Sequence, residues 1–141
     1  ADPRLRVWGG DYLHKKLHKE FDKELLEQNP NITIELSAHC DFRGSASFNE
    51  KLSQARAESA VAYLVSQGIE KERMTPVGYG ESKPKVVNKK LTERYTFLSE
   101  GDVLTEEFIG NLKDEEQQEI CNQLNRRTEF QVLRTTYKLY E

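Results

Sequence analysis

The 141 residues are enough for one domain that folds around its own core without a metal or a disulfide. With 21 Lys and Arg against 24 Asp and Glu, the net charge is −3, which excludes the broad basic field typical of proteins that bind nucleic acid or anionic membranes. No apolar run approaches the roughly 20 residues of a membrane span. We therefore expect a soluble chain whose opening, ADPRLRVWGG, is the cut edge of a longer protein.

The first third of the chain predicts a strand, a helix and a second strand. A short strand is expected at residues 4–8, within an N-terminal segment of residues 1–11. Apolar residues at every fourth position predict an amphipathic helix over residues 13–28. In ITIEL, residues 32–36, apolar and polar side chains alternate as in a half-buried strand, which leads directly into Asp41.

The middle of the chain predicts a loop, a long helix and a short strand. The loop is FRGSAS, residues 42–47. Ser47, followed three residues later by a glutamate, has the spacing of a capping box and is the expected helix start. The helix is expected to end at Gly68, followed by a strand at residues 73–77 and a turn at GYGESKP, residues 78–84.

The last part of the chain begins with a polar, weakly periodic stretch. We interpret residues 83–101 as a long loop, within an insertion of about residues 83–113 in a domain that spans residues 12–141. Thr105 and Asp114 are expected to cap two further helices. A final strand is expected in TEFQVLRT, residues 128–135. Strands and helices thus interleave, which predicts an α/β (α+β) sandwich with one mixed four-stranded sheet and helices packed on one face.

Catalytic and metal-binding patterns are weak. His14 and His18 have the spacing of a zinc pair, but a lysine occupies the position of the glutamate that HExxH enzymes need. Neighbours in His39–Cys40–Asp41 point to opposite faces of an extended chain, so they form no nucleophile and base pair. Two cysteines, Cys40 and Cys121, are too few for a zinc ribbon and are either free thiols or one disulfide.

Asp41 and Arg56 form the most informative pair. An acid at the end of a strand and an arginine on the following helix can face one crevice, where ligands of α/β sheets commonly bind. One anion and one cation at such a place suit a zwitterion. The alternative is a structural ion pair between the two side chains without a ligand.

Four motifs then occur in order: IxIELxxHxD at residues 32–41, NxxLSxxRA at 49–57, GYGExxP at 78–84 and NRRTEF at 125–130. Together they resemble the OmpA-like C-terminal domain, which is shared with Pal and MotB proteins, over roughly residues 12–135. The long segment before the last motif resembles the enlarged version in Bacteroidetes-type members.

The resemblance implies a binding module without catalysis, metal or cofactor. Such domains hold peptidoglycan noncovalently through the diaminopimelate residue of its stem peptide. The implied location is the periplasm, where the domain anchors an outer-membrane protein or lipoprotein to the cell wall. Two alternatives stay open: a peptidoglycan-acting enzyme, for which no catalytic framework is visible, and an assembly domain with a degenerate ligand site.

The ligand-binding positions of the family fall on Asp41 and Arg56. By this resemblance, Asp41 receives the ammonium group of the ligand and Arg56 binds the carboxylate of the same amino-acid end. Asn125 and Arg126 match positions that line the same site, whereas Arg127 is expected to be structural. The residues expected to contribute secondarily are His39, Phe42, Asn49 and Ser53.

Two departures from the family pattern affect this site. Relatives usually have GHTD where this chain has AHCD, so Cys40 replaces a hydroxyl donor beside Asp41. VWGGDY, residues 7–12, does not match the segment that contributes backbone to the pocket in the family. Because Cys121 lies one helical turn before Asn125, the resemblance places it near Cys40 and allows a Cys40–Cys121 disulfide, which the periplasm permits.

Overall fold

The computed structural model of the chain describes residues 7–9 and 22–138. They form one open sheet with the strand order β1-β4-β2-β3, in which β2 runs parallel to β3 and antiparallel to β4. The strands are β1 (Val7–Gly9), β2 (Thr33–His39), β3 (Met74–Gly80) and β4 (Arg127–Arg134). The mixed α/β class and the single sheet are as predicted. Only three of the four expected strands are long, because β1 pairs just three residues with β4.

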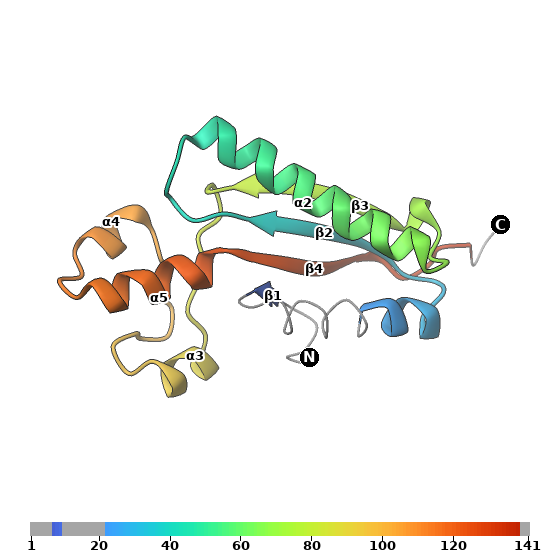
Figure 1. Cartoon of the computed structure of the whole chain (residues 1–141). Coiled ribbons are helices and arrows are strands. Elements are labelled where there is room, and N and C mark those ends of the chain that lie inside the picture. The colour runs from blue at the N-terminus through green and yellow to red at the C-terminus, as the bar shows by residue number, and fades with distance from the viewer. Residues whose placement is uncertain (1–6, 10–21, 139–141) are drawn as a thin grey trace.

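The long helix α2 (Ala46–Ser66) lies along β2 and β3 (Figure 1). Its N-cap is Ser45, whose side chain accepts a hydrogen bond from the backbone N–H of Phe48. The prediction of Ser47 as the cap was therefore wrong by two residues. At the other end, Gly68 has φ +97°, the left-handed conformation that ends helices and that glycine adopts without strain.

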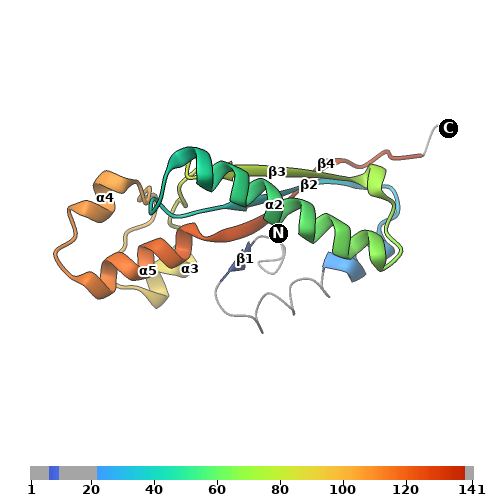
Figure 2. The same cartoon turned by 45° about the horizontal axis from the view of Figure 1, so that its top comes forward.

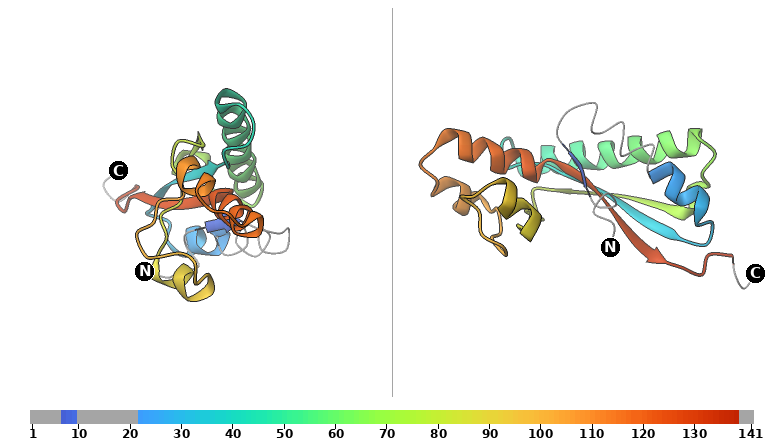
Figure 3. Two further views of the ribbon diagram at one scale, coloured as in Figure 1. Left: turned by 90° about the vertical axis from the view of Figure 1, so that its left-hand side faces the viewer. Right: turned by 90° about the horizontal axis from the view of Figure 1, so that it is seen from below.

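A helix at residues 22–28 packs on the same face of the sheet as α2. Both helices contribute to one apolar cluster with alternate residues of β2, and the two helices lie on one side of the strands in the right-hand view of Figure 3. The cluster consists of Leu26, Ile32, Ile34, Leu36, Ala60, Val61, Leu64, Ile69 and Met74. The remainder of the helix predicted over residues 13–28 lies outside the described residues, as do most of the strand predicted at 4–8 and the histidines at 14 and 18.

The contact between α2 and β3 is unusually close at Gly78. A Cβ atom there would lie 2.1 Å from the backbone nitrogen of Gln54, so only glycine fits. Two hydrogen bonds fasten this contact: Gly78 N–H donates to Gln54 Oε1 at 2.8 Å, and Gly80 N–H donates to Ser53 Oγ at 2.8 Å. The first three residues of GYGESKP therefore belong to β3 rather than to the predicted turn.

Residues 85–125 form a terminal lobe beyond the end of the sheet (Figure 2). It contains α3 (Lys89–Arg94), α4 (Glu106–Gly110) and α5 (Glu115–Asn125), and the expected caps Thr105 and Asp114 are confirmed. Its helices pack around a second apolar cluster, Val87, Leu98, Leu104, Ile109 and Cys121. The stretch predicted as a long loop is therefore partly helical. Even α2, the longest described helix, is not apolar enough to cross a membrane.

Candidate functional site

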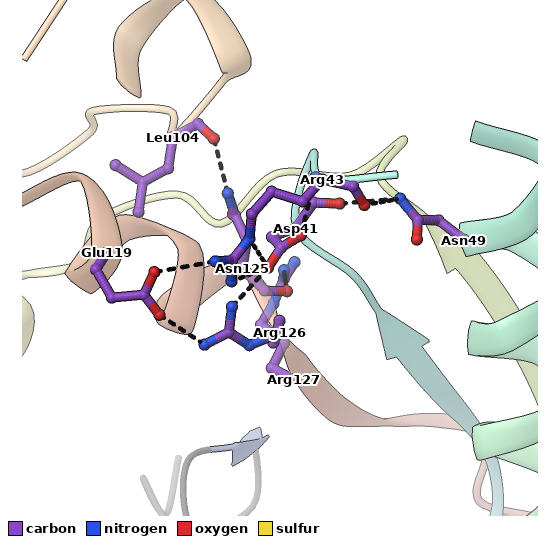
Figure 4. Close-up of polar contacts among 8 residues, drawn as sticks. All are labelled: Asp41, Arg43, Asn49, Leu104, Glu119, Asn125, Arg126 and Arg127. Atoms are coloured by element: carbon purple, nitrogen blue, oxygen red, sulfur yellow. Dashed lines mark hydrogen bonds and ion pairs between the residues drawn. The ribbon is translucent and has the colours of Figure 1, made fainter. Parts of the chain in front are cut away.

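Asp41 lies where β2 has ended and the loop to α2 begins, and its carboxylate is buried (Figure 4). Oδ1 accepts the backbone N–H of Arg43 at 2.9 Å. Oδ2 accepts Nε and Nη2 of Arg43 at 3.1 and 2.7 Å, and Nη1 of Arg126 at 2.5 Å. The expected proximity of Arg126 to Asp41 is therefore confirmed.

Glu119 completes this arrangement from α5. Its Oε2 accepts a hydrogen bond from Nη1 of Arg43 at 3.2 Å, and its Oε1 accepts one from Nη2 of Arg126 at 3.2 Å. We call Asp41, Arg43, Glu119 and Arg126 the charged cluster; it joins the loop after β2 to α5 and its C-cap (Figure 4). Charge-assisted bonds between guanidinium and carboxylate groups are stronger than neutral ones, so this cluster links the sheet to the terminal lobe.

The charged cluster keeps Asp41 ionised. Burial of the carboxylate disfavours its charged form, but the hydrogen bonds from Arg43 and Arg126 outweigh burial and hold the pKa of Asp41 below its ordinary value. The bond to Asp41 correspondingly raises the pKa of the Arg43 guanidinium. Asp41 is thus an anion under all physiological conditions and suits a cationic ligand group.

Arg56 behaves differently from Asp41. Its side chain is exposed on α2, and the described part of the chain offers it no hydrogen bond or ion pair. The alternative in which Asp41 and Arg56 simply pair with each other is therefore wrong. Both charges nevertheless act on the Cys40 thiol: burial raises the pKa of that thiol, Arg56 lowers it and Asp41 raises it. The exposed guanidinium of Arg56 is therefore available to a ligand.

The structure gives Asn125 and Arg127 structural roles. Asn125 is fully buried, where its Oδ1 accepts the backbone N–H of Lys85 at 2.9 Å and its Nδ2 donates to the carbonyl of Leu104 at 3.0 Å. Arg127 donates to Glu129 Oε1 at 2.6 Å and to the carbonyls of Asn125 and Lys83, as expected for a structural residue. The side chain of Asn125 thus holds the lobe together, although sequence reasoning placed it at the ligand.

The expected secondary residues also support the fold. Asn49 Nδ2 donates to the carbonyls of Asp41 and Arg43 at 3.3 and 3.0 Å and so fixes the loop between them. Ser53 makes the contact with β3 described above, and Phe42 packs against the apolar cluster of the lobe. Of these residues, Asn49 positions Asp41 directly, through the backbone carbonyl of Asp41 and not through its carboxylate.

His39 is buried on the opposite face of β2 from the α2 contact. Its Nε2 lies 3.1 Å from Ser37 Oγ, and its ring stacks on Tyr79 with centroids 5.3 Å apart. Burial and the positive charge of Arg127 lower the pKa of His39 to about 4, against the opposing effect of Glu129. At neutral pH it is an uncharged part of the sheet.

The predicted disulfide is not formed: Cys40 and Cys121 are both free and buried. The Cys40 thiol donates to the carbonyl of Asn49 at 3.4 Å, whereas Cys121 packs in the apolar cluster of the lobe. The residues described contain no group of three His, Cys, Asp or Glu that could hold a metal ion.

Sequence reasoning missed Arg43 and Glu119. Local signals for both exist in hindsight. Arg43 lies two residues after Asp41, where a backbone N–H often bonds an aspartate side chain. Glu119 lies seven residues before Arg126, about two helical turns, which places both on one side of α5.

Known proteins share part of this sequence. The OmpA family model matches residues 9–96. Outer membrane porin F of Pseudomonas fluorescens is 41% identical over 61 residues, which are 43% of this chain and 19% of the porin. The peptidoglycan-associated lipoprotein of Buchnera aphidicola is 39% identical over 61 residues, 43% of this chain and 35% of the lipoprotein. The match thus spans only about a fifth to a third of these relatives.

Solved structures share the fold. The crystal structure of the peptidoglycan-associated lipoprotein from Burkholderia pseudomallei superposes with a TM-score of 0.62 at 19% identity and covers 91% of this chain and 90% of that one. The cell wall anchor of the T6SS from Pseudomonas aeruginosa gives a TM-score of 0.54 at 19% identity, covering 90% of this chain and 71% of that one. Since the family model spans more than half of the sequence, the chain belongs to the OmpA family.

Proposed function

We propose that the chain binds peptidoglycan noncovalently through the zwitterionic end of diaminopimelate in the stem peptide. Asp41 receives the ammonium group, and Arg56 binds the carboxylate with its planar guanidinium. The observation that carries this proposal is the exposed guanidinium of Arg56, which has no partner among the described residues. It lies on α2, the helix whose Asn49 side chain donates to the carbonyl of Asp41. The module acts by binding, without catalysis.

The similar proteins point to a cellular role. One relative is by name a peptidoglycan-associated lipoprotein, and one structural neighbour is by title a cell wall anchor. In our proposal the chain does the same in the periplasm and tethers an outer-membrane protein or lipoprotein to the wall. Modest affinity at each site suffices, because a polymeric wall offers many sites to many anchored copies. The terminal lobe, most of which follows the family match, is then an enlargement of the domain.

One observation favours a second candidate, an assembly domain without a wall ligand. The carboxylate of Asp41 already accepts four hydrogen bonds from Arg43 and Arg126, as a purely structural carboxylate would. In that case the charged cluster would only connect the lobe to the sheet, and Arg56 would have no ligand.

Calorimetric titration separates these functions. Meso-diaminopimelate and a stem peptide that contains it are titrated into the wild type, Asp41→Asn, Arg56→Gln and the control Arg94→Gln, an exposed arginine of α3. We expect binding by the wild type and Arg94→Gln, and at least a tenfold loss in the other two, since each lacks one charge-assisted contact. Circular dichroism checks that all four fold. A folded wild type that binds neither compound would favour the assembly domain, and soluble fragments released from purified sacculi would indicate an enzyme.

A further inference from the structure

The ligand site of the proposed function is closed in this structure by Arg43. A carboxylate offers about four lone-pair positions, and the two oxygens of Asp41 accept four N–H groups. Three of these come from Arg43: its backbone N–H, Nε and Nη2. An incoming ammonium group therefore finds no vacant acceptor on Asp41 unless one of its partners leaves.

Exposure indicates which partner leaves. The side chain of Arg43 is 59% exposed, whereas that of Arg126 is 32% exposed. Arg126 also caps α5, where its backbone N–H bonds the carbonyl of Asn122. Arg43 belongs instead to the loop before α2, and its guanidinium can rotate into solvent while its backbone N–H stays on Asp41 Oδ1. The Arg43 side chain is the removable cation of the charged cluster.

We propose, on the basis of the function above, that Arg43 is a specificity-determining residue that occupies Asp41 in the free protein and is exchanged for the ammonium group of the ligand. The exchange replaces one cation by another, so the buried anion of Asp41 is never left unpaired, which would be strongly unfavourable. The released guanidinium stays beside Glu119, whose carboxylate it already contacts at 3.2 Å. Ligands that carry carboxylates but no ammonium group have nothing to exchange and are rejected.

The exchange lowers the apparent affinity of the wild type, because a ligand binds only the fraction of molecules in which Arg43 has left Asp41. Removing the charge of Arg43 while keeping a polar side chain should therefore strengthen binding. If Arg43 has left Asp41 in about a tenth of the wild-type molecules, in which Arg126 still pairs the carboxylate, the gain is about tenfold. A residue that only held the loop in place would give no gain when changed.

The test compares the wild type with Arg43→Gln, and uses Arg94→Gln as the control for loss of one exposed positive charge. Meso-diaminopimelate and pimelate, which has both carboxylates but no ammonium group, are titrated into each protein. We expect Arg43→Gln to bind meso-diaminopimelate about five- to tenfold more tightly than the wild type, Arg94→Gln to be unchanged, and pimelate to bind none of them. In ¹⁵N spectra of the wild type, the Arg43 Nε–H should lose its protection from exchange with water when ligand is added.

The outcomes separate the two proposals. If the wild type binds and Arg43→Gln binds equally or more weakly, the exchange is refuted while the proposed function stands. Retained protection of the Arg43 Nε–H in the ligand-saturated wild type refutes it independently, whatever the variant does. If neither the wild type nor a folded Arg43→Gln binds meso-diaminopimelate, the proposed function fails and the exchange fails with it.

Discussion

Two regions of the molecule are stabilised in different ways: the sheet with its two packed helices, and the terminal lobe. In the former, which we call the body (residues 22–80 and 127–134), the 21-residue helix α2 touches β3 backbone to backbone at Gly78. In the lobe, helices of 5 to 11 residues surround a small apolar cluster and depend on side-chain caps and on Asn125. The two charges of the proposed site therefore have unequal supports: Arg56 depends on the body alone, whereas Asp41 is held by both regions through the charged cluster.

The largest expected effect concerns the body. In Gly78→Ala the added Cβ would overlap the backbone of Gln54, so α2 must move away from β3, and we expect a loss of about 3 kcal/mol or more in the free energy of unfolding. Gly110→Ala in the lobe is the matched control, because nothing lies within 4 Å of its added Cβ. Urea unfolding of both variants measures the difference. Equal losses would show that close packing is no special property of the body.

The second prediction concerns the pH dependence of stability that His39 gives to the body. Because burial and Arg127 lower the pKa of His39 from 6.5 to about 4, the unfolded chain binds a proton in this window that the folded chain does not. Stability must therefore fall as the pH falls from 6.5 toward 4, by roughly 2 to 3 kcal/mol at pH 4.5 at 1.36 kcal/mol per pKa unit.

The measurement compares urea unfolding at pH 7 and pH 4.5 for the wild type and His39→Gln. The variant has no imidazole to protonate and should lose less stability between the two values. A wild type and variant with the same pH dependence would remove His39 from the acid response between pH 7 and pH 4.5. Asp41 does not contribute in this window, because its pKa is held below its ordinary value.

The smallest expected effect concerns the lobe. Asn125→Ala removes two buried hydrogen bonds and leaves the backbone N–H of Lys85 and the carbonyl of Leu104 without this partner, which should lower stability by about 2 kcal/mol. Gln123→Ala, at an exposed position of the same helix, is the control. Hydrogen exchange should then accelerate in residues 85–125 and not in α2. Acceleration in both regions would show that body and lobe unfold as one unit.

Much of the body was predictable because its signals are local. Alternation in ITIEL gave β2, and Gly68 marked the end of α2. The predicted start of α2 was wrong because Ser45 and Ser47 are both suitable N-cap residues. Asn49, bonded to the carbonyls of Asp41 and Arg43, binds the first turn of the helix to this loop, an interaction that the capping pattern does not contain. Likewise, the sequence around Gly78 predicts a turn, whereas Gly78 lies in β3 and its lack of a side chain allows the close contact with α2.

The candidate site was predictable only in part, since its contacts are between distant residues. The motif resemblance brought Asp41 and Arg126 together correctly, 85 positions apart in sequence. It could not reveal that Arg43 fills the coordination of Asp41, because an arginine in a loop carries no distinctive pattern. For Asn125 it suggested a ligand contact, whereas the buried amide satisfies backbone groups of the lobe. A polar residue of a motif can therefore either contact the ligand or satisfy buried backbone groups.

The close approach at Gly78 bears on how far apart the charged groups of a ligand can lie in the proposed site. Gln54, which meets Gly78, precedes Arg56 by two residues in α2, and Asp41 follows the strand that is paired with β3. The backbone positions of both charges are thus set by the same contact, in which helix and strand meet without a side chain of residue 78 between them. The backbone of such a site is preorganised and loses little conformational entropy on binding, even though the Arg43 side chain must move. In the proposed function, a fixed span between anion and cation would favour a ligand that carries its ammonium and carboxylate on one carbon over one that holds them farther apart.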